Sequence, residues 1–269
     1  MRRAEFMKML TEAEGTSHIV TDGGNMDRTE ELYNFINTYT EEHELPNARI
    51  ALRAARELME GIVRTSGDFD KDGVLQQSFF EHCLFVTKLL IDLYIPLSHE
   101  EQDILVAAGL CHDTIAHAGF QRGGRELIED YGLDPRVRDI VRITTKINVK
   151  NETDLRNFYK EIRFNKLAVL VAMADRSNLV ENVYALSVNE ALEYIREIRD
   201  YAMPMCVYAL EHYPDIQRPM RLIVDKIHNL IDVTDIISRR YKDKENELKK
   251  ELLALREENA QLRGMIASL

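Results

Sequence analysis

The stretch of sequence that decides the fold is ILVAAGLCHDT, residues 104–114. Its apolar residues recur at helical spacing and do not alternate with polar ones, so the stretch predicts a buried helix. The run ends in His112 and Asp113, two side chains that are costly to bury without a partner. The residues after this pair are TIAH, so no carboxylate lies within the next helical turn. We therefore expect a helical core that encloses a polar site.

The same spacing continues on both sides of this stretch. Upstream, we expect a helix from Thr29, whose hydroxyl can cap it, and another from Pro46. Strand signals are few and no internal repeat is present, so the fold class we expect is all-α. The remaining predicted helices cover residues 79–95, 99–117, 124–131, 135–147, 152–162, 164–180, 188–212 and 216–242.

The chain divides by composition into three parts. Residues 1–28 are polar and rich in turn residues, and we expect them to form a mobile segment. Residues 29–242 form the predicted helical domain, whose core can draw on the chain's 45% hydrophobic residues. Residues 243–269 carry a different, seven-residue pattern. We therefore expect one large domain with a C-terminal appendage.

The appendage resembles a leucine zipper. One seam position repeats every seven residues as leucine, and the alternate seam positions include one asparagine, which favours a parallel two-stranded coil. The seam residues are Leu248, Leu252, Leu255, Asn259, Leu262, Ile266 and Leu269. Glu251 can meet Arg256 of a second copy, and Glu258 can meet Arg263. We expect a homodimer through residues 243–269; the alternative is a solvated, charged single helix.

Composition excludes several classes of partner. The net charge is −11, which argues against a protein that binds the phosphate backbone of nucleic acids, although a local cluster of arginines could still bind a small anion. We find no apolar run of membrane-spanning length and no signal-peptide core, so we expect a cytoplasmic protein with no membrane partner. Cys83, Cys111 and Cys206 form no CxxC pair, which fits small buried side chains in a reducing compartment.

His82, His112 and Asp175 are predicted to face the core. Each shares its helix face with apolar residues three, four or seven positions away. For a single histidine, a hydrogen-bonded core residue is the commoner explanation. A buried aspartate, however, needs a cation or several donors.

A divalent metal ion explains His82, His112, Asp113 and Asp175 together. Two imidazoles and two carboxylates suit a divalent ion such as Mn²⁺, Fe²⁺, Zn²⁺, Co²⁺ or Mg²⁺. Adjacent helical side chains diverge by about 100°, so His112 and Asp113 can bind one ion only near a helix end. Water on such an ion loses a proton near neutral pH and becomes a nucleophile.

In this order, His82, His112-Asp113 and Asp175 resemble the H…HD…D pattern of HD-domain metal-dependent phosphohydrolases. The chain is similar in particular to the hydrolase domain of RelA/SpoT-type (p)ppGpp hydrolases, over roughly residues 48–212. The segments that carry this resemblance are Arg64-Thr65-Ser66-Gly67, Ala108-Gly109-Leu110-Cys111-His112-Asp113-Thr114, Thr145-Lys146 and Leu170-Val171-Ala172-Met173-Ala174-Asp175-Arg176.

The resemblance implies an HD-domain helical bundle and a reaction. His82, His112, Asp113 and Asp175 would hold Mn²⁺, Asp113 also serving catalysis, and Arg64 would contact a bound nucleotide, with Lys146 and Asn178 as further substrate-binding candidates. The reaction would remove the 3′-diphosphate from a guanosine alarmone. Metal-activated water would attack phosphorus, while the metal and basic side chains neutralise the charge on the phosphoryl oxygens.

The chain departs from the family pattern at two places: the acidic pair that follows HD-Thr, and the asparagine that follows the last aspartate. The family follows its HD-Thr with a Glu-Asp pair that assists attack and leaving-group protonation, whereas this chain has Ala116 and His117. His117 could protonate a leaving phosphate, or it could be an exposed helix-end residue. The family's asparagine, four residues after the last aspartate, is Leu179 here, with Asn178 and Asn182 nearby.

Three functions follow from these residues. The leading hypothesis is a guanosine-3′,5′-bis(diphosphate) 3′-pyrophosphohydrolase-like enzyme. The alternatives are an HD phosphohydrolase for another nucleotide and a non-catalytic metal- or nucleotide-binding sensor or scaffold. Most basic residues after the central pair are expected to be solvated, although one or two of them could steer a polyphosphate: Arg122, Arg125, Lys146, Arg156, Lys160 and Arg163.

Overall fold

A computed structural model describes residues 24–59, 62, 78–118, 127, 129–147, 149–181 and 188–267. Within these ranges the chain forms helices and no strand, which confirms the all-α prediction. The longer helices are α2 (Gly24–Glu42), α3 (Pro46–Met59), α4 (Phe79–Asp92), α5 (His99–Cys111), α6 (Thr114–Ala118), α8 (Pro135–Thr144), α9 (Glu152–Ile162), α10 (Lys166–Glu181), α11 (Val188–Glu197), α12 (Met203–His212) and α13 (Gln217–Ala267). A π-helical turn, η4 (Ile198–Ala202), joins α11 to α12, and a 3₁₀ turn, η5 (Pro214–Ile216), precedes α13.

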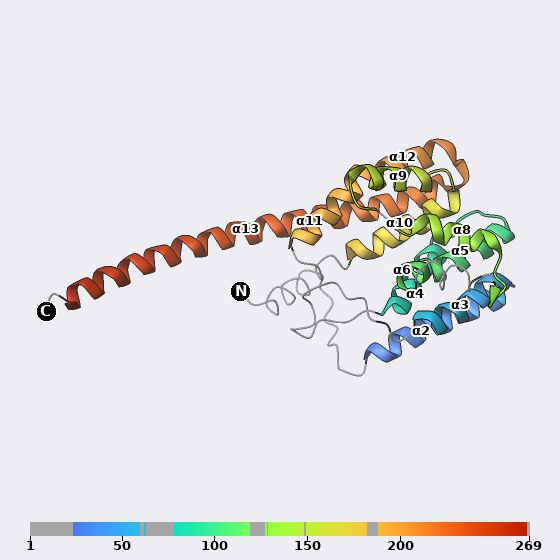
Figure 1. Cartoon of the computed structure of the whole chain (residues 1–269), viewed down its shortest axis with the longest axis horizontal. Helices are drawn as coiled ribbons and strands as arrows, with labels where there is room; N and C mark the ends of the chain where they lie inside the picture. Colours follow the sequence, from blue (N-terminus) through green and yellow to red (C-terminus); the bar gives the residue numbers. More distant parts are fainter. Residues whose placement is uncertain are drawn as a thin grey trace.

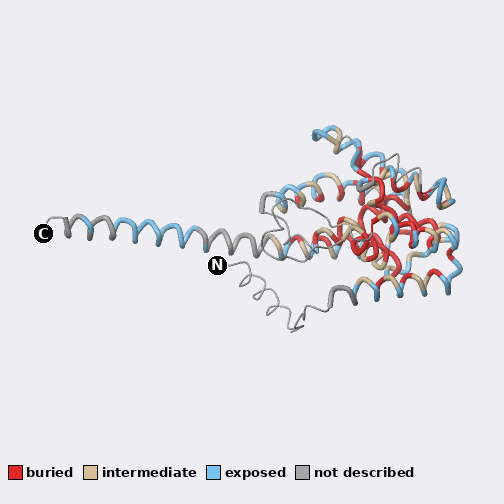
Figure 2. The backbone as a smooth tube through the Cα atoms, turned by 60° about the horizontal axis from the view of Figure 1, so that its bottom comes forward, coloured by how far each residue is buried: buried red, intermediate tan, exposed pale blue. Residues whose placement is uncertain are grey.

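The helices pack as a bundle around α4, α5 and α10. Helix α5 packs against α3, α4, α8 and α10, and α10 also contacts α4, α9 and α13. Figure 1 shows α2 and α3 along one side of the bundle and α9 and α12 along the opposite side. Buried residues concentrate in the bundle, as Figure 2 shows, and Phe80, Leu84 and Leu110 are at most 1% exposed. The predicted core stretch, residues 104–111, is buried throughout.

The predicted helix 99–117 is broken at the His112-Asp113 pair. Helix α5 starts at a capping box, in which Ser98 and Glu101 satisfy each other's backbone amides, and ends at Cys111 with His112 as its C-cap. The Thr114 hydroxyl donates to the Cys111 carbonyl (2.7 Å), and α6 then starts at Thr114. This break places the pair at a helix end, the position at which adjacent side chains can approach one ion.

Two other predicted boundaries differ from the structure. Helix α2 begins at Gly24, five residues before the predicted cap Thr29, because residues 24–28 contain no helix-breaking proline. The predicted helix 188–212 contains the π-helical turn η4. Pro204, in the first turn of α12, cannot donate to the preceding turn and its ring crowds that turn's carbonyl, so the wider π-turn fits it.

Helix α13 runs without a break from Gln217 to Ala267, across the expected boundary at residue 243. Its first half packs on the bundle through Met220, Ile223, Ile227 and Ile231, each at most 2% exposed. Its second half extends away from the bundle (Figures 1 and 2). No helix in the described ranges is both long enough and apolar enough to cross a membrane. Residues 1–23 and half of the predicted helix 124–131 lie outside the described residues.

Candidate metal centre

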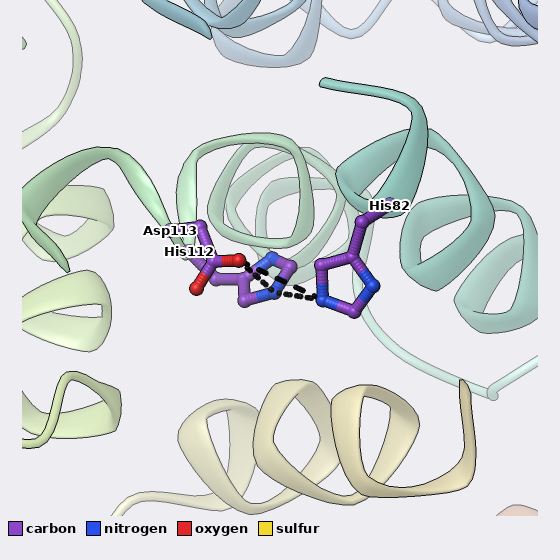
Figure 3. A group of neighbouring side chains, drawn as sticks. All are labelled: His82, His112 and Asp113. Carbon is purple, nitrogen blue, oxygen red and sulfur yellow. Dashed lines mark hydrogen bonds and ion pairs between the residues drawn. The ribbon is translucent and has the colours of Figure 1, made fainter. Parts of the chain in front are cut away.

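Three helices bring the predicted metal-binding residues together. His82 lies in the second turn of α4, which Ser78 caps by accepting from the Glu81 amide (3.0 Å). His112 and Asp113 lie at the break after α5, and Asp175 lies on α10. His82 and His112 are 0% and 5% exposed, which confirms that both histidines face the core. In Figure 3 the two imidazoles and the Asp113 carboxylate point toward one another.

The facing atoms are close enough to share one ion. The ligand atoms of His82, His112 and Asp113 all lie within 4.8 Å of one another. Nε2 of His82 and Nε2 of His112 are 3.1 Å apart. Asp113 Oδ2 lies 3.7 Å from His82 Nε2 and 3.8 Å from His112 Nε2. Asp175 Oδ1 lies 3.0 Å from His82 Nε2 and 3.8 Å from His112 Nε2. Two atoms bound to one ion at about 2.1 Å would be roughly 3.0–3.5 Å apart. The two shortest of these distances lie in that range and the other three are slightly longer, so small side-chain movements would let the group share one cation.

A hydrogen-bond acceptor beside Nδ1 fixes the tautomer of each histidine. His112 Nδ1 lies 2.8 Å from the Gly109 carbonyl, which can only accept, so this Nδ1 carries the proton. His82 Nδ1 lies 2.7 Å from Asn178 Oδ1, so it too is the donor. In the neutral rings both Nε2 atoms then present lone pairs toward each other and toward the carboxylate oxygens. Such a group of acceptors is repulsive unless a cation or a proton lies among them.

The charges of the site favour positive charge at this point. Burial by itself disfavours a charged imidazole, but Cys83 and Asp113, with Asp175, raise the pKa of His112 to about 10. Burial would raise the pKa of Asp175, yet the Arg176 guanidinium and the two imidazoles hold it below its usual range. Within the described residues, the buried Asp113 Oδ2 has no hydrogen-bond partner. A divalent cation satisfies all of these groups at once, so the residues fit a metal ion, whose identity they do not fix.

A buried ion-pair network supports Asp175 from the side away from the histidines. Arg176, 6% exposed, contacts Asp175 Oδ2 through NH1 and donates from Nε to the Tyr159 hydroxyl (3.0 Å). The Tyr159 hydroxyl donates to Glu197 Oε1 (2.6 Å), which also lies 3.7 Å from Arg176 NH2. Burial would raise the pKa of Glu197, but Arg176 and Lys146 together lower it. The sequence analysis missed this network, although an arginine directly after Asp175 in an apolar run was a signal of it.

The predicted substrate-binding residues have different surroundings. Asn178, 6% exposed, lies beside the His82 ring and orients it. Lys146 pairs with Glu197 (2.6 Å), and its side chain is 34% exposed. Burial and the nearby Arg176 lower the pKa of Lys146, against the opposing pull of Glu197. Lys146 therefore lies at the outer edge of the Arg176 network, and its substrate-binding role remains a prediction, as does that of Asn178.

The remaining predicted residues lie around α6 and α3. Arg64 lies outside the described residues. His117 belongs to α6, but its side chain is not among those described, so its role as a catalytic acid remains a prediction. Ala116 is exposed on the same short helix. The position at which the family pattern has a carboxylate is thus open to solvent and carries only a methyl group.

Comparison of the chain with known proteins gives no match: no family model, no curated protein and no solved structure is similar to it.

Proposed function

We propose that this chain is a metal-dependent phosphohydrolase of the HD type. The observation that carries the proposal is the convergence of His82, His112 and Asp113 within 4.8 Å, with Asp175 Oδ1 3.0 Å from His82 Nε2. We propose further that the substrate is guanosine 3′,5′-bis(diphosphate) and that the products are GDP and pyrophosphate. The support for this substrate is the ordered resemblance from Arg64 to Arg176.

The chain's own residues divide the work of the proposed reaction. A divalent ion, when bound, supplies Lewis acidity and an activated water. Asn178 accepts a hydrogen bond from Nδ1 of His82, and the Gly109 carbonyl accepts one from Nδ1 of His112. These two bonds keep Nε2 of each ring unprotonated and directed toward the ion. Arg176 keeps Asp175 ionised and in place. Water that attacks the phosphorus bound to the ribose 3′-oxygen expels that oxygen, which must take up a proton. Ala116 cannot supply it, so His117, four residues after Asp113, is the acid we propose.

The function is tested by product analysis on the full chain with Mn²⁺. We expect GDP and pyrophosphate from guanosine 3′,5′-bis(diphosphate), and no products with Asp113→Asn, which keeps the size of the side chain but removes its charge. Release of orthophosphate from a different nucleotide would favour the other-substrate alternative. Tight binding of the alarmone without turnover would overturn the enzyme proposal in favour of the sensor. That alternative draws on the exposed Ala116, where the family pattern has an acid.

We also propose that two chains assemble through the second half of α13. The seam residues Leu248, Leu252 and Leu255 are 44%, 50% and 61% exposed on the single chain. Exposed leucines at heptad spacing are stabilised when a second helix covers them. The matching copy is this chain itself, because Glu251 and Glu258 lie where they can meet Arg256 and Arg263 of a partner.

Charge placed on this seam is expected to separate the dimer. The double variant Leu252→Glu with Leu255→Glu puts four like charges into one short interface, so sedimentation should give the mass of a single chain. Leu253→Glu is the matched control, because Leu253 is 59% exposed but lies off the seam. The control should sediment as the wild type does. An unchanged dimer in the double variant would contradict assembly through α13.

A further inference from the structure

A second cavity, of about 500 Å³, lies between α9 and the segment formed by η4 and α12. It is separate from the metal centre, whose ligands come from α4, α10 and the end of α5, and the proposed hydrolysis does not use it. In Figure 1 these helices lie on the side of the bundle opposite α2 and α3. We propose that this cavity binds a nucleotide, with its basic side chains on the phosphates and Tyr201 against the base.

Basic side chains of α9 supply the phosphate contacts. Arg156, Lys160 and Arg163 all line the cavity, spaced so that they share one face of the helix. Arg156 is partly engaged with Glu152 (3.3 Å). Lys160 and Arg163 form no ion pair with any carboxylate of the described part of the chain, and Lys160 is exposed. Two cations without counter-ions at one cavity are a suitable contact for a diphosphate.

The half-buried Arg163 lies against two aromatic rings and has hydrogen-bonding capacity left. Its guanidinium lies 4.7 Å from the ring centroids of both Phe164 and Tyr208. Its Nε is buried and has no hydrogen-bond partner within the described residues. An arginine fixed by aromatic rings loses little conformational entropy when it binds a planar or tetrahedral anion. Arg163 is therefore poised to bind an anionic group.

One tyrosine provides the accessible aromatic wall of the cavity. Tyr201 lines it and stacks on the buried Tyr159, which is 3% exposed, with ring centroids 6.1 Å apart and an interplanar angle of 15°. Base stacking on such rings contributes about 1–3 kcal/mol per base and tolerates different bases. Tyr201 belongs to the π-helical turn η4, and π-turns occur frequently at functional sites. The acidic residues of the wall are already engaged, Glu152 by Arg156 and Asp200 by Arg196 at 3.9 Å.

The proposal does not depend on the hydrolase, because it rests on residues outside the metal centre. The cavity does touch that centre indirectly: the Tyr159 hydroxyl binds Arg176, which contacts Asp175. Two side chains, Tyr159 and Arg176, would therefore separate a nucleotide in the cavity from the candidate metal ligand Asp175.

Calorimetric titration of the full chain tests the proposal, with ADP, GDP and pyrophosphate as probes and EDTA present to keep the metal centre free of ions. We expect ADP or GDP to bind with submillimolar affinity, and pyrophosphate to bind about tenfold more weakly because it lacks a base. Lys160→Glu should weaken nucleotide binding about tenfold or more. Lys250→Glu makes the same charge change on the exposed second half of α13 and should leave binding unchanged.

Asp113→Asn locates the bound probe. This variant should bind the nucleotides as the wild type does, because Asp113 belongs to the metal centre and not to the cavity. Loss of binding in Asp113→Asn would place the nucleotide at the metal centre and overturn the proposal. Equal binding by Lys160→Glu and the wild type, or no binding of either nucleotide by the wild type up to the millimolar range, would also overturn it.

Discussion

Arg176→Met is expected to lower the free energy of unfolding by about 3–5 kcal/mol, because it removes one partner from a buried ion-pair network. The guanidinium contacts Asp175, lies 3.7 Å from Glu197 and donates to the Tyr159 hydroxyl. Methionine fills a similar volume, so the loss is chiefly electrostatic: the largely buried Asp175 loses its arginine partner, and Glu197 retains Lys146 but loses Arg176. Urea denaturation followed by circular dichroism measures the difference.

The pH dependence of this difference has a definite sign. Arg176 and Lys146 hold the pKa of Glu197 below its usual value. The ion pairs of Glu197 therefore stabilise the native state above the ordinary carboxyl pKa, and this contribution is lost as the pH falls through the lowered pKa of the native state. The gap between wild type and variant should therefore narrow in acid. Arg49→Met is the control, because Arg49 pairs with Glu41 at the surface and should change stability by less than about 1 kcal/mol. Equal losses in the two variants would contradict a structural role for the network.

His112→Ala is expected to abolish stabilisation by Mn²⁺. An ion that binds only the native state raises the free energy of unfolding by about 2.7 kcal/mol at 100 times its dissociation constant. Wild-type protein should show this gain, and the variant should show none, because the ligand atoms left are too few to hold the ion. The measured quantity is the change in the free energy of unfolding when Mn²⁺ is added to the same protein. The variant is less stable without metal because it has lost a buried ring, but this loss cancels in the comparison.

A matched histidine separates specific from general effects of Mn²⁺. His43 is exposed, lies in the turn after α2, and has its Nδ1 3.0 Å from the Tyr39 carbonyl; it belongs to none of the elements that carry the metal centre. His43→Ala should keep the full Mn²⁺ gain. The same gain in His112→Ala would show that the stabilising ion binds elsewhere.

The burial of the two histidines could be predicted from the sequence because burial follows local periodicity. His82 and His112 share faces with apolar residues, and both are buried. Binding of one ion by His112 and Asp113 required a helix end, and the break after Cys111 provides one. The prediction of one continuous helix over 99–117 was wrong. The helical spacing of apolar residues continues into α6, so it gives no sign of the turn at His112 and Asp113.

The Arg176 network could not be predicted in the same way. Tyr159 lies 17 residues before Arg176, on a separate helix, and Glu197 lies on a third. Periodicity within each helix assigns an inward face but does not tell which helices are neighbours. The cavity beside α9 could not be predicted either, because it also depends on which helices are neighbours. The basic side chains of α9 have the spacing of a solvated helix face, and only the packing of η4 and α12 beside them forms the cavity.

Anomalous diffraction from crystals of the full chain soaked in Mn²⁺ tests the central claim most directly. We expect one peak between α4, α10 and the end of α5, about 2.0–2.3 Å from Nε2 of His82 and His112 and from carboxylate oxygens of Asp113 and Asp175. Absence of a peak there at saturating Mn²⁺, with the two imidazoles still facing each other at hydrogen-bonding distance, would contradict it.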